Sequence, residues 1–355
     1  MISRRTFTKA AGLGVGATAV CVGAAPAAAG AAAGRPEQPK RPAPVIPATA
    51  PGTHTAFTDL KQIHAGVLDV GYAEAGPEHG PVVICLHGWP YDIHSYVDVA
   101  PLLAAAGYRV IVPYLRGHGT TSFLSPATVR NAQQSAIALD VIALMDALKI
   151  RKAVLAGFDW GSRTAGIIAA LWPERVKALV PVSGYLITNV QAQKSPLPPK
   201  AEHIWWYQYY FATDRGRVAM ETRQYRHDLC RLVWDEVSPT WNFDDTTFER
   251  TAAAFENPDY AAIVIHNYRW RLGLADGERC YDRYERALAA RPAIGVPTIT
   301  LDPALDPFLT STDGAGYRKH FTGAYEHRVL TGIGHDAPQE APTAFAQAVV
   351  DADHL

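Results

Sequence analysis

The feature that most constrains this chain is a short turn at residues 157–161, which read Gly-Phe-Asp-Trp-Gly. An apolar run at 153–156 precedes the turn, and residues 162–171 follow it with the composition of a helix. A strand, a tight turn flanked by glycines and a helix together present a reactive side chain at the tip of the turn. Glycines suit such a strained turn because larger side chains would collide there. The pattern therefore predicts that Asp159 is a nucleophile, and a carboxylate at this place favours attack on a saturated carbon.

Strand-like and helix-like segments alternate on both sides of this turn. A continuous apolar run at 81–86 is typical of a strand that is buried on both faces, and further strands are expected at 108–115 and 176–182. A helix is indicated by apolar residues that would lie on one of its faces, namely Ile137, Val141, Leu144 and Leu148. Further helices are expected at 97–106 and 342–350. This alternation predicts an α/β fold with a mostly parallel sheet flanked by helices.

The edges of the sheet are predicted from shorter patterns. Period-two patterning at 57–75 indicates a hairpin with Val67, Val70 and Tyr72 among its core residues. Two later segments, 294–301 and 326–330, are expected to resume and complete the sheet. No internal repeat is evident in the sequence.

The composition changes after about residue 185. Residues 204–211 are dense in aromatic side chains, and helical segments continue to about residue 289 without a clear strand. We therefore expect an α/β core made of residues 57–185 and 291–355, with residues 186–290 inserted as a helical cap.

The N-terminal residues are expected to lie outside this fold. Arg4 and Arg5 precede an Ala- and Gly-rich apolar run, so residues 1–33 are typical of a twin-arginine export signal. The run is short and weakly hydrophobic, which argues against a stable membrane anchor. Residues 34–56 are Pro- and Ala-rich and are expected to form a linker. The prediction is an exported protein, periplasmic or extracellular.

Composition excludes several partners. The 355 residues carry a formal net charge of −1, which gives no reason to expect binding to nucleic acid. Cysteine spacing resembles no zinc site, and no glycine-rich phosphate loop follows a strand, so we expect neither a metal nor another cofactor. Cys230 and Cys280 could pair after export or remain free, whereas Cys85 is expected to be a small buried hydrophobe.

Two more residues complete a catalytic chain order. Asp159 is followed by an acid after the strand at 294–301, and then by His335 after the last strand. Asp302 and Asp306 are both candidates for the acid; Asp306 is favoured because it lies farther into the loop. Attack by a carboxylate leaves an ester, which His335 could hydrolyse by deprotonating water while the acid orients its ring. The backbone amides of Trp89 and Trp160 are expected to form the oxyanion hole, and Pro90 is a candidate for a cis bond.

Residues 157–161 together with His-Gly-Trp-Pro at 87–90 resemble the epoxide hydrolase and haloalkane dehalogenase branch of the α/β-hydrolase superfamily. The resemblance extends over residues 57–350. Within this branch, epoxide hydrolases use two cap tyrosines as proton donors to the epoxide oxygen. A Tyr-Gln-x-Tyr-Phe pattern assigns the first role to Tyr207, and a Tyr-Arg pair assigns the second to Tyr268. The resemblance thus implies hydrolysis of a small, apolar epoxide to a vicinal diol.

The same residues allow two other functions. Dehalogenases place N–H donors around a halide, which Trp89, Trp160 and Trp206 could provide, and Trp206 is in either case expected to contact the substrate. Haloacetate dehalogenases add arginines for the substrate carboxylate; Arg163, in the helix after the turn, is a candidate for that role or for a structural one. A ligand-binding protein without catalysis is the third hypothesis, and the complete order of nucleophile, acid and histidine argues against it.

Overall fold

The centre of the molecule is formed by strands whose side chains have no access to water. All five residues of β6 (Ala153–Gly157) are buried, and so are the last four of β3 (Val82–Leu86). These strands pair in parallel, with Ile84 opposite Leu155. The computed structural model describes residues 43–190, 192–309 and 311–355. The predicted signal and the first part of the predicted linker lie outside the described residues.

A sheet of nine strands extends from this centre in the order β1-β2-β4-β3-β6-β7-β8-β9, with β5 paired to β2. The strands from β4 to β9 along this order run parallel, whereas β2 is antiparallel to β1, β4 and β5. The other strands are β1 (Leu60–Ala65), β2 (Leu68–Ala75), β4 (Arg109–Pro113), β5 (Ser122–Phe123), β7 (Val176–Pro181), β8 (Thr298–Pro303) and β9 (Tyr325–Leu330). The predicted α/β fold with a mostly parallel sheet is confirmed.

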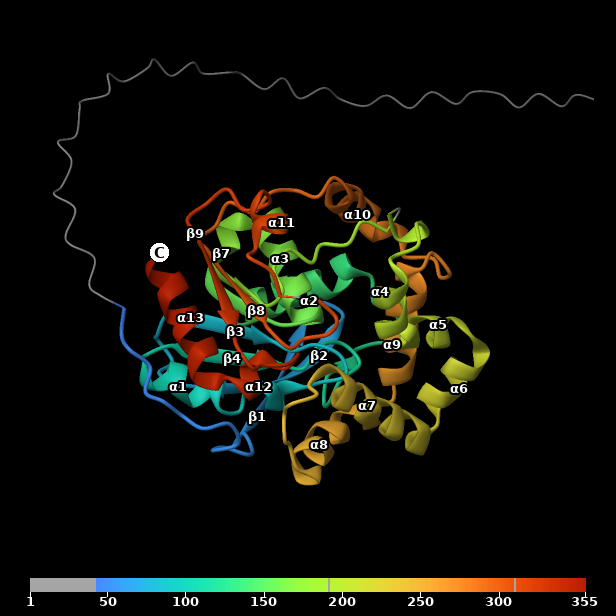
Figure 1. Cartoon of the computed structure of the whole chain (residues 1–355), viewed down its shortest axis with the longest axis horizontal. Helices are drawn as coiled ribbons and strands as arrows, with labels where there is room; N and C mark the ends of the chain where they lie inside the picture. The colour runs from blue at the N-terminus through green and yellow to red at the C-terminus, as the bar shows by residue number, and fades with distance from the viewer. Residues whose placement is uncertain (1–42, 191, 310) are drawn as a thin grey trace, which may run out of the picture. The chain divides into compact units, whose positions relative to one another are not determined.

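Helices cover the sheet in two groups (Figure 1). In one group α1 packs against α13, and in the other α2 packs against α3. These core helices are α1 (Val99–Ala105), α2 (Gln134–Ala147), α3 (Trp160–Leu171), α11 (Ala315–Arg318), α12 (Ala337–Glu340) and α13 (Pro342–His354). Helix α3, which follows the turn at 157–161, contacts β3, β6 and β7, so it is anchored on the central strands that position the nucleophile.

Every regular element between β7 and β8 is a helix, as expected for the predicted cap. Figure 1 shows these helices, coloured from yellow-green to orange, beside the sheet. They are α4 (Pro199–Ile204), α5 (Trp206–Ala212), α6 (Asp214–Glu221), α7 (Arg223–Val237), α8 (Asp245–Ala252), α9 (Tyr260–Arg271) and α10 (Asp282–Ala289). The insertion is therefore confirmed, while its limits as a separate domain stay a prediction.

Two details of the sequence-based prediction are wrong. Val67 was expected in the core but is 39% exposed, because it lies in the turn between β1 and β2 rather than in a strand. The strand expected at 294–301 begins only at Thr298, after Pro297, which cannot donate a backbone hydrogen bond to the sheet. Asp302 consequently lies inside β8 rather than after it.

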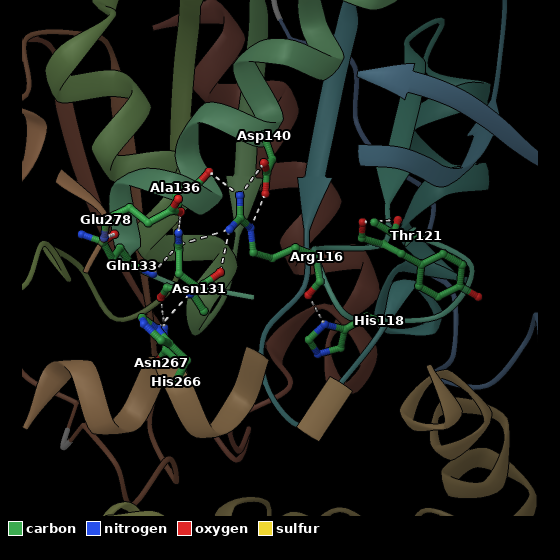
Figure 2. A network of polar contacts seen from close by, with 12 residues as sticks. Arg116, His118, Thr121, Asn131, Gln133, Ala136, Asp140, His266, Asn267 and Glu278 are labelled. Carbon is green, nitrogen blue, oxygen red and sulfur yellow. Dashed lines mark hydrogen bonds and ion pairs between the residues drawn. The ribbon is translucent and has the colours of Figure 1, made fainter. Parts of the chain in front are cut away.

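A buried polar network joins the end of β4 to the cap (Figure 2). The guanidinium of Arg116 donates from Nε and Nη2 to both carboxylate oxygens of Asp140 in α2, over 2.6 and 2.7 Å. Its Nη1 donates to the carbonyl of Asn131 at 2.6 Å. The adjoining Ala132 receives a hydrogen bond from Asn267 and donates one to His266, both in α9. This network fixes α9, the helix that carries Tyr268, against the core.

The cysteines within the described part of the chain do not pair. Cys85 and Cys230 are buried free thiols, and Cys280 is an exposed free thiol. In the part of the chain that the structure describes, no helix combines the length and the apolar composition needed to cross a membrane.

Candidate active site

The turn at 157–161 has the strained geometry that its sequence predicts. Asp159 adopts φ 48° and ψ −119°, in a region that residues other than glycine rarely occupy. A Cβ on Gly161 would lie 1.8 Å from the carbonyl oxygen of Leu86, and one on Gly88 would lie 2.4 Å from Cβ of Asp159. Glycine is therefore required at both positions, because they let the turn approach the end of β3.

The two oxygens of the Asp159 carboxylate face different partners. Oδ1 accepts a hydrogen bond of 2.9 Å from the backbone amide of Trp89. Oδ2 lies 3.8 Å from Nε2 of His335, which is too long for a hydrogen bond but close enough for strong charge attraction. The Trp89–Pro90 peptide bond is cis, as predicted. Trp160 is the first residue of α3, directly after the nucleophile, and the role of its amide stays a prediction.

The structure brings Asp306, not Asp302, to the histidine. Oδ2 of Asp306 lies 2.8 Å from Nδ1 of His335, and both residues are buried. Asp302 instead accepts a hydrogen bond of 2.7 Å from the hydroxyl of Tyr317. Asp302 therefore stabilises the segment after β8, and the three side chains with nucleophile–histidine–acid geometry are Asp159, His335 and Asp306.

Charges in this group stabilise one another. Burial acts to lower the pKa of His335, but the negative charges of Asp306 and Asp159 outweigh it and raise the pKa to about 10. Burial acts to raise the pKa of Asp159, but His335, Arg163 and the Trp89 amide together bring it below its ordinary value. The resting site therefore holds an ionised nucleophile beside an imidazolium.

A set of side chains behind His335 was not foreseen from the sequence. The hydroxyl of Ser238 accepts a hydrogen bond of 3.0 Å from the His335 amide and donates one of 2.7 Å to Glu340. Glu340 also accepts from the Gly334 amide at 2.7 Å. Ser238 follows the cap helix α7, so cap and core together hold the histidine loop. No local sequence pattern signals this, since the partners lie about one hundred positions apart.

Asp336, next to the histidine, points away from Asp159. It accepts a hydrogen bond of 2.8 Å from Ser95 and caps α12 by accepting another from the Gln339 amide. Burial is the main cause that raises the pKa of Asp336 to about 8. Its role is thus structural.

A cavity of about 340 Å³ opens above the nucleophile and is lined by Asp159, His335 and Tyr207. Residues of the cap and of the segment that follows β7 complete the lining. Tyr268 packs beside it, with its ring centroid 5.3 Å from that of Tyr207 and 5.3 Å from that of Trp89. Burial is the main cause that raises the pKa of both tyrosines well above the ordinary value, so both hydroxyls keep their protons. Tyr207 therefore lines the cavity, and Tyr268 packs against Tyr207 beside the cavity.

The expected substrate contact of Trp206 is not supported. Its indole Nε1 donates to Glu236 over 3.0 Å, and its side chain lines a different pocket with residues such as His203 and Val237. Trp206 begins α5, and the next residue, Tyr207, takes the inward direction. The tryptophan that does line the cavity at Asp159 is Trp205.

Several cavity residues were missed or weighed too lightly. Arg271 and Arg291 line the cavity together with Arg163, and so do Gln208 and Phe308. Spacing could not identify them, because they come from the end of α9, the segment after α10 and the loop after β8. Among the described residues, no group of three or more His, Cys, Asp or Glu side chains is arranged to hold a metal ion.

Comparison with known proteins places this geometry in a family. Residues 81–219 match the family model described as the alpha/beta hydrolase fold. The chain is 60% identical to a candidate epoxide hydrolase from Klebsiella pneumoniae of known crystal structure, with a TM-score of 0.82 over 84% of this chain and 99% of that one. The chain belongs to the epoxide hydrolase and haloalkane dehalogenase branch of the α/β-hydrolase superfamily.

Other members of this α/β-hydrolase branch are more distant. Epoxide hydrolase A of Mycobacterium tuberculosis is 26% identical over 78% of this chain and 92% of its own length. Haloalkane dehalogenase of Mycobacterium marinum is 28% identical over 60% of this chain and 71% of its own length. Epoxide hydrolase 3 of Siraitia grosvenorii is 36% identical, but this chain spans only 40% of that relative. Both activities of the branch are thus represented among the relatives.

Proposed function

We propose that this protein is an epoxide hydrolase that converts a small epoxide to a vicinal diol through an ester of Asp159. The observation that carries the proposal is the orientation of the Asp159 carboxylate. One oxygen accepts from the Trp89 amide, and the other faces His335 in a cavity that Tyr207 also lines. A serine hydrolase would present a hydroxyl at this position instead.

In the first step, Oδ2 of Asp159 attacks one carbon of the epoxide, and the ring C–O bond breaks. The oxygen that leaves the carbon takes a proton from Tyr207, with Tyr268 as the second donor. Burial raises the pKa of both phenols, so each stays protonated until the alkoxide develops beside it. The products of this step are an alkyl ester of Asp159 and a free alcohol group.

In the second step, water attacks the carbonyl carbon of the ester. His335 first gives its resting proton to the phenolate left at Tyr207. As a neutral base it then takes a proton from the attacking water through Nε2, and Asp306 stabilises the imidazolium through Nδ1 at 2.8 Å. The Trp89 amide already binds Oδ1 and is placed to stabilise the oxyanion that forms on it. Collapse of the tetrahedral intermediate releases the diol and restores the carboxylate.

Halide release from a haloalkane is the weaker candidate. Its predicted indole donors do not line the cavity: Trp89 and Trp160 are buried outside its lining, and Trp206 donates to Glu236. The apolar side of the cavity, formed by residues such as Ile187, Leu197 and Phe308, suits the hydrophobic body of a small substrate.

A panel of epoxides and haloalkanes tests the proposal, with diol and halide measured in parallel. We expect diol from epoxides, and a fall in kcat of about 100-fold or more in the Tyr207→Phe/Tyr268→Phe double variant. Tyr209→Phe, an exposed tyrosine of the same helix as Tyr207, is the matched control. Release of halide without any diol would contradict the proposal, and full activity of the double variant would remove the tyrosines from the mechanism.

We also propose that the protein is exported by the twin-arginine route. The support is sequence alone: Arg4 and Arg5 precede an apolar run rich in alanine and glycine. We expect the Arg4→Lys/Arg5→Lys variant to be lost from the exported fraction of cells, as measured by fractionation and immunoblotting. An unchanged distribution would contradict this route.

A further inference from the structure

The cavity above Asp159 carries an excess of positive charge that hydrolysis of an epoxide does not itself require. Its lining includes the three arginines Arg163, Arg271 and Arg291, whereas Asp159 is the only acid among the described residues that line it. None of these arginines forms an ion pair with a described carboxylate. The negative charge of Asp159 is itself shared with His335 and the Trp89 amide.

Arg163 is the most enclosed of the three. It lies one helical turn after the nucleophile in α3, with its amide donating to the Asp159 carbonyl at 3.1 Å. Only 9% of the residue is exposed. Its Nε donates to the carbonyl of Leu186 at 3.1 Å, which fixes the direction of the side chain. The guanidinium is therefore held at the cavity wall by a neutral partner, and no described carboxylate forms a direct ion pair with it.

Arg271 reaches the cavity from the cap. It is the last residue of α9, three positions after Tyr268, and its guanidinium carbon lies 5.6 Å from the centroid of the Tyr268 ring. Its Nε is buried and has no hydrogen-bond partner among the described residues. A buried guanidinium donor without an acceptor is costly, so a ligand that accepts from it would stabilise this arrangement.

The charge of Arg271 also acts on Arg163. Burial lowers the pKa of Arg163 to about 10, and the charge of Arg271 is the next cause. Arg291 differs, because it is exposed and stacks over the ring of Tyr185 at 5.5 Å. Arg163 and Arg271 are thus the more enclosed pair of arginines in the lining, and Arg291 is the exposed one.

We propose that the cavity takes epoxides that carry a carboxylate, which Arg163 and Arg271 bind while an epoxide carbon faces Asp159. The planar guanidinium matches the geometry of a carboxylate and forms strong charge-assisted hydrogen bonds with it. The inference rests on the proposed epoxide hydrolysis and changes the substrate class from the wholly apolar molecule expected from the sequence to one with an apolar body and an anionic end.

A simpler role for Arg163 would be to keep Asp159 ionised. That role would affect every epoxide equally, whereas carboxylate binding affects only anionic ones. The ratio of kcat/KM for an anionic and a neutral epoxide of the same shape therefore separates the two roles. The salts of 3-phenyloxirane-2-carboxylic acid and the corresponding carboxamide form such a pair.

We expect the wild-type protein to prefer the carboxylate to the carboxamide by about 10-fold or more in kcat/KM. Arg271→Gln and Arg163→Gln should each reduce this preference by about 10- to 100-fold, and Arg271→Lys should retain part of it. Arg215→Gln is the matched control, because Arg215 is an exposed cap arginine outside the cavity lining and the substitution changes net charge equally. Thermal unfolding of each variant checks that the fold is retained.

The outcomes separate this inference from the proposed function. If both epoxides give diol but the kcat/KM values for carboxylate and carboxamide are nearly equal, the carboxylate inference is overturned. It is also overturned if the arginine variants keep the wild-type preference for the carboxylate. In both cases the proposed epoxide hydrolase function stands. If neither epoxide gives diol and chloroacetate releases chloride, the epoxide function fails, and the inference fails with it as stated. Titration calorimetry of Asp159→Asn with both epoxides adds a readout without turnover, in which Arg271→Gln should remove the tighter binding of the carboxylate.

Discussion

Each oxygen of the Asp159 carboxylate has one neighbour that matters for chemistry. The Trp89 amide holds Oδ1 at 2.9 Å, and Nε2 of His335 stands 3.8 Å from Oδ2. Formation of the ester removes the negative charge of Asp159, and with it one of the causes that raise the pKa of His335. The pKa of His335 therefore falls from about 10 when the ester forms, so His335 can return its proton to the phenolate left at Tyr207 and become the neutral base that ester hydrolysis needs.

The rate of ester hydrolysis should consequently increase with pH. His335 acts as a base only when it is deprotonated, so protonation at low pH should block this step, while Asp159, with its lowered pKa, still attacks. We expect the ester to accumulate as pH falls, measured by intact mass spectrometry of protein quenched during turnover. His335→Gln should accumulate the ester at every pH. An ester fraction that does not change with pH in the wild type would contradict this assignment of the base.

At the scale of elements, the sheet is joined to its helices by buried polar contacts as well as by apolar packing. The clearest is the two-point contact between Arg116, at the end of β4, and Asp140 in α2 (Figure 2). The side chain of Arg116 is 1% exposed and that of Asp140 is 13% exposed. Removing one partner of such a pair leaves an uncompensated buried charge, which costs more than the pair contributes when intact.

We therefore expect Asp140→Asn to lower the free energy of unfolding by about 3 to 5 kcal/mol. Asp146→Asn is the control on the same helix: its side chain is 63% exposed and pairs with Arg175, so the loss should be at most about 1 kcal/mol. Urea denaturation of both variants measures the difference. Equal stability of the two variants would show that Arg116 finds another partner and that Asp140 is not the decisive contact.

At the scale of the whole molecule, the cap is fixed to the core around the site rather than only covering it. Glu285 of α10 accepts from the Ser135 amide at 3.1 Å and from the Gln134 side chain at 3.0 Å, at the start of α2. On the other side, Ser238 binds the His335 amide, and Trp234 of α7 donates to the Pro90 carbonyl at 2.8 Å. The cap therefore contributes to the position of the catalytic loops as well as to the cavity wall.

The sequence by itself determined the α/β fold, the inserted helical cap and the positions of Asp159 and His335. These follow from local patterns: continuous apolar runs for buried strands, and glycines that a strained turn requires at Gly157 and Gly161. The position of Trp89 and the cis Pro90 were also accessible, because they follow directly from the end of a strand.

Only the tertiary structure shows that Asp306, and not Asp302, contacts His335. It also shows that Trp206 lies outside the lining of the cavity at Asp159 and that Arg163 and Arg271 both line it. The ends of separate elements meet there, and no spacing along the chain encodes which side chains they present to one another. Strand β8 ends two residues later than its pattern indicated, and this shift alone places Asp302 within the sheet and leaves Asp306 free to reach His335. Chemistry carried by one turn can be predicted from the sequence, whereas substrate selection depends on how distant segments pack.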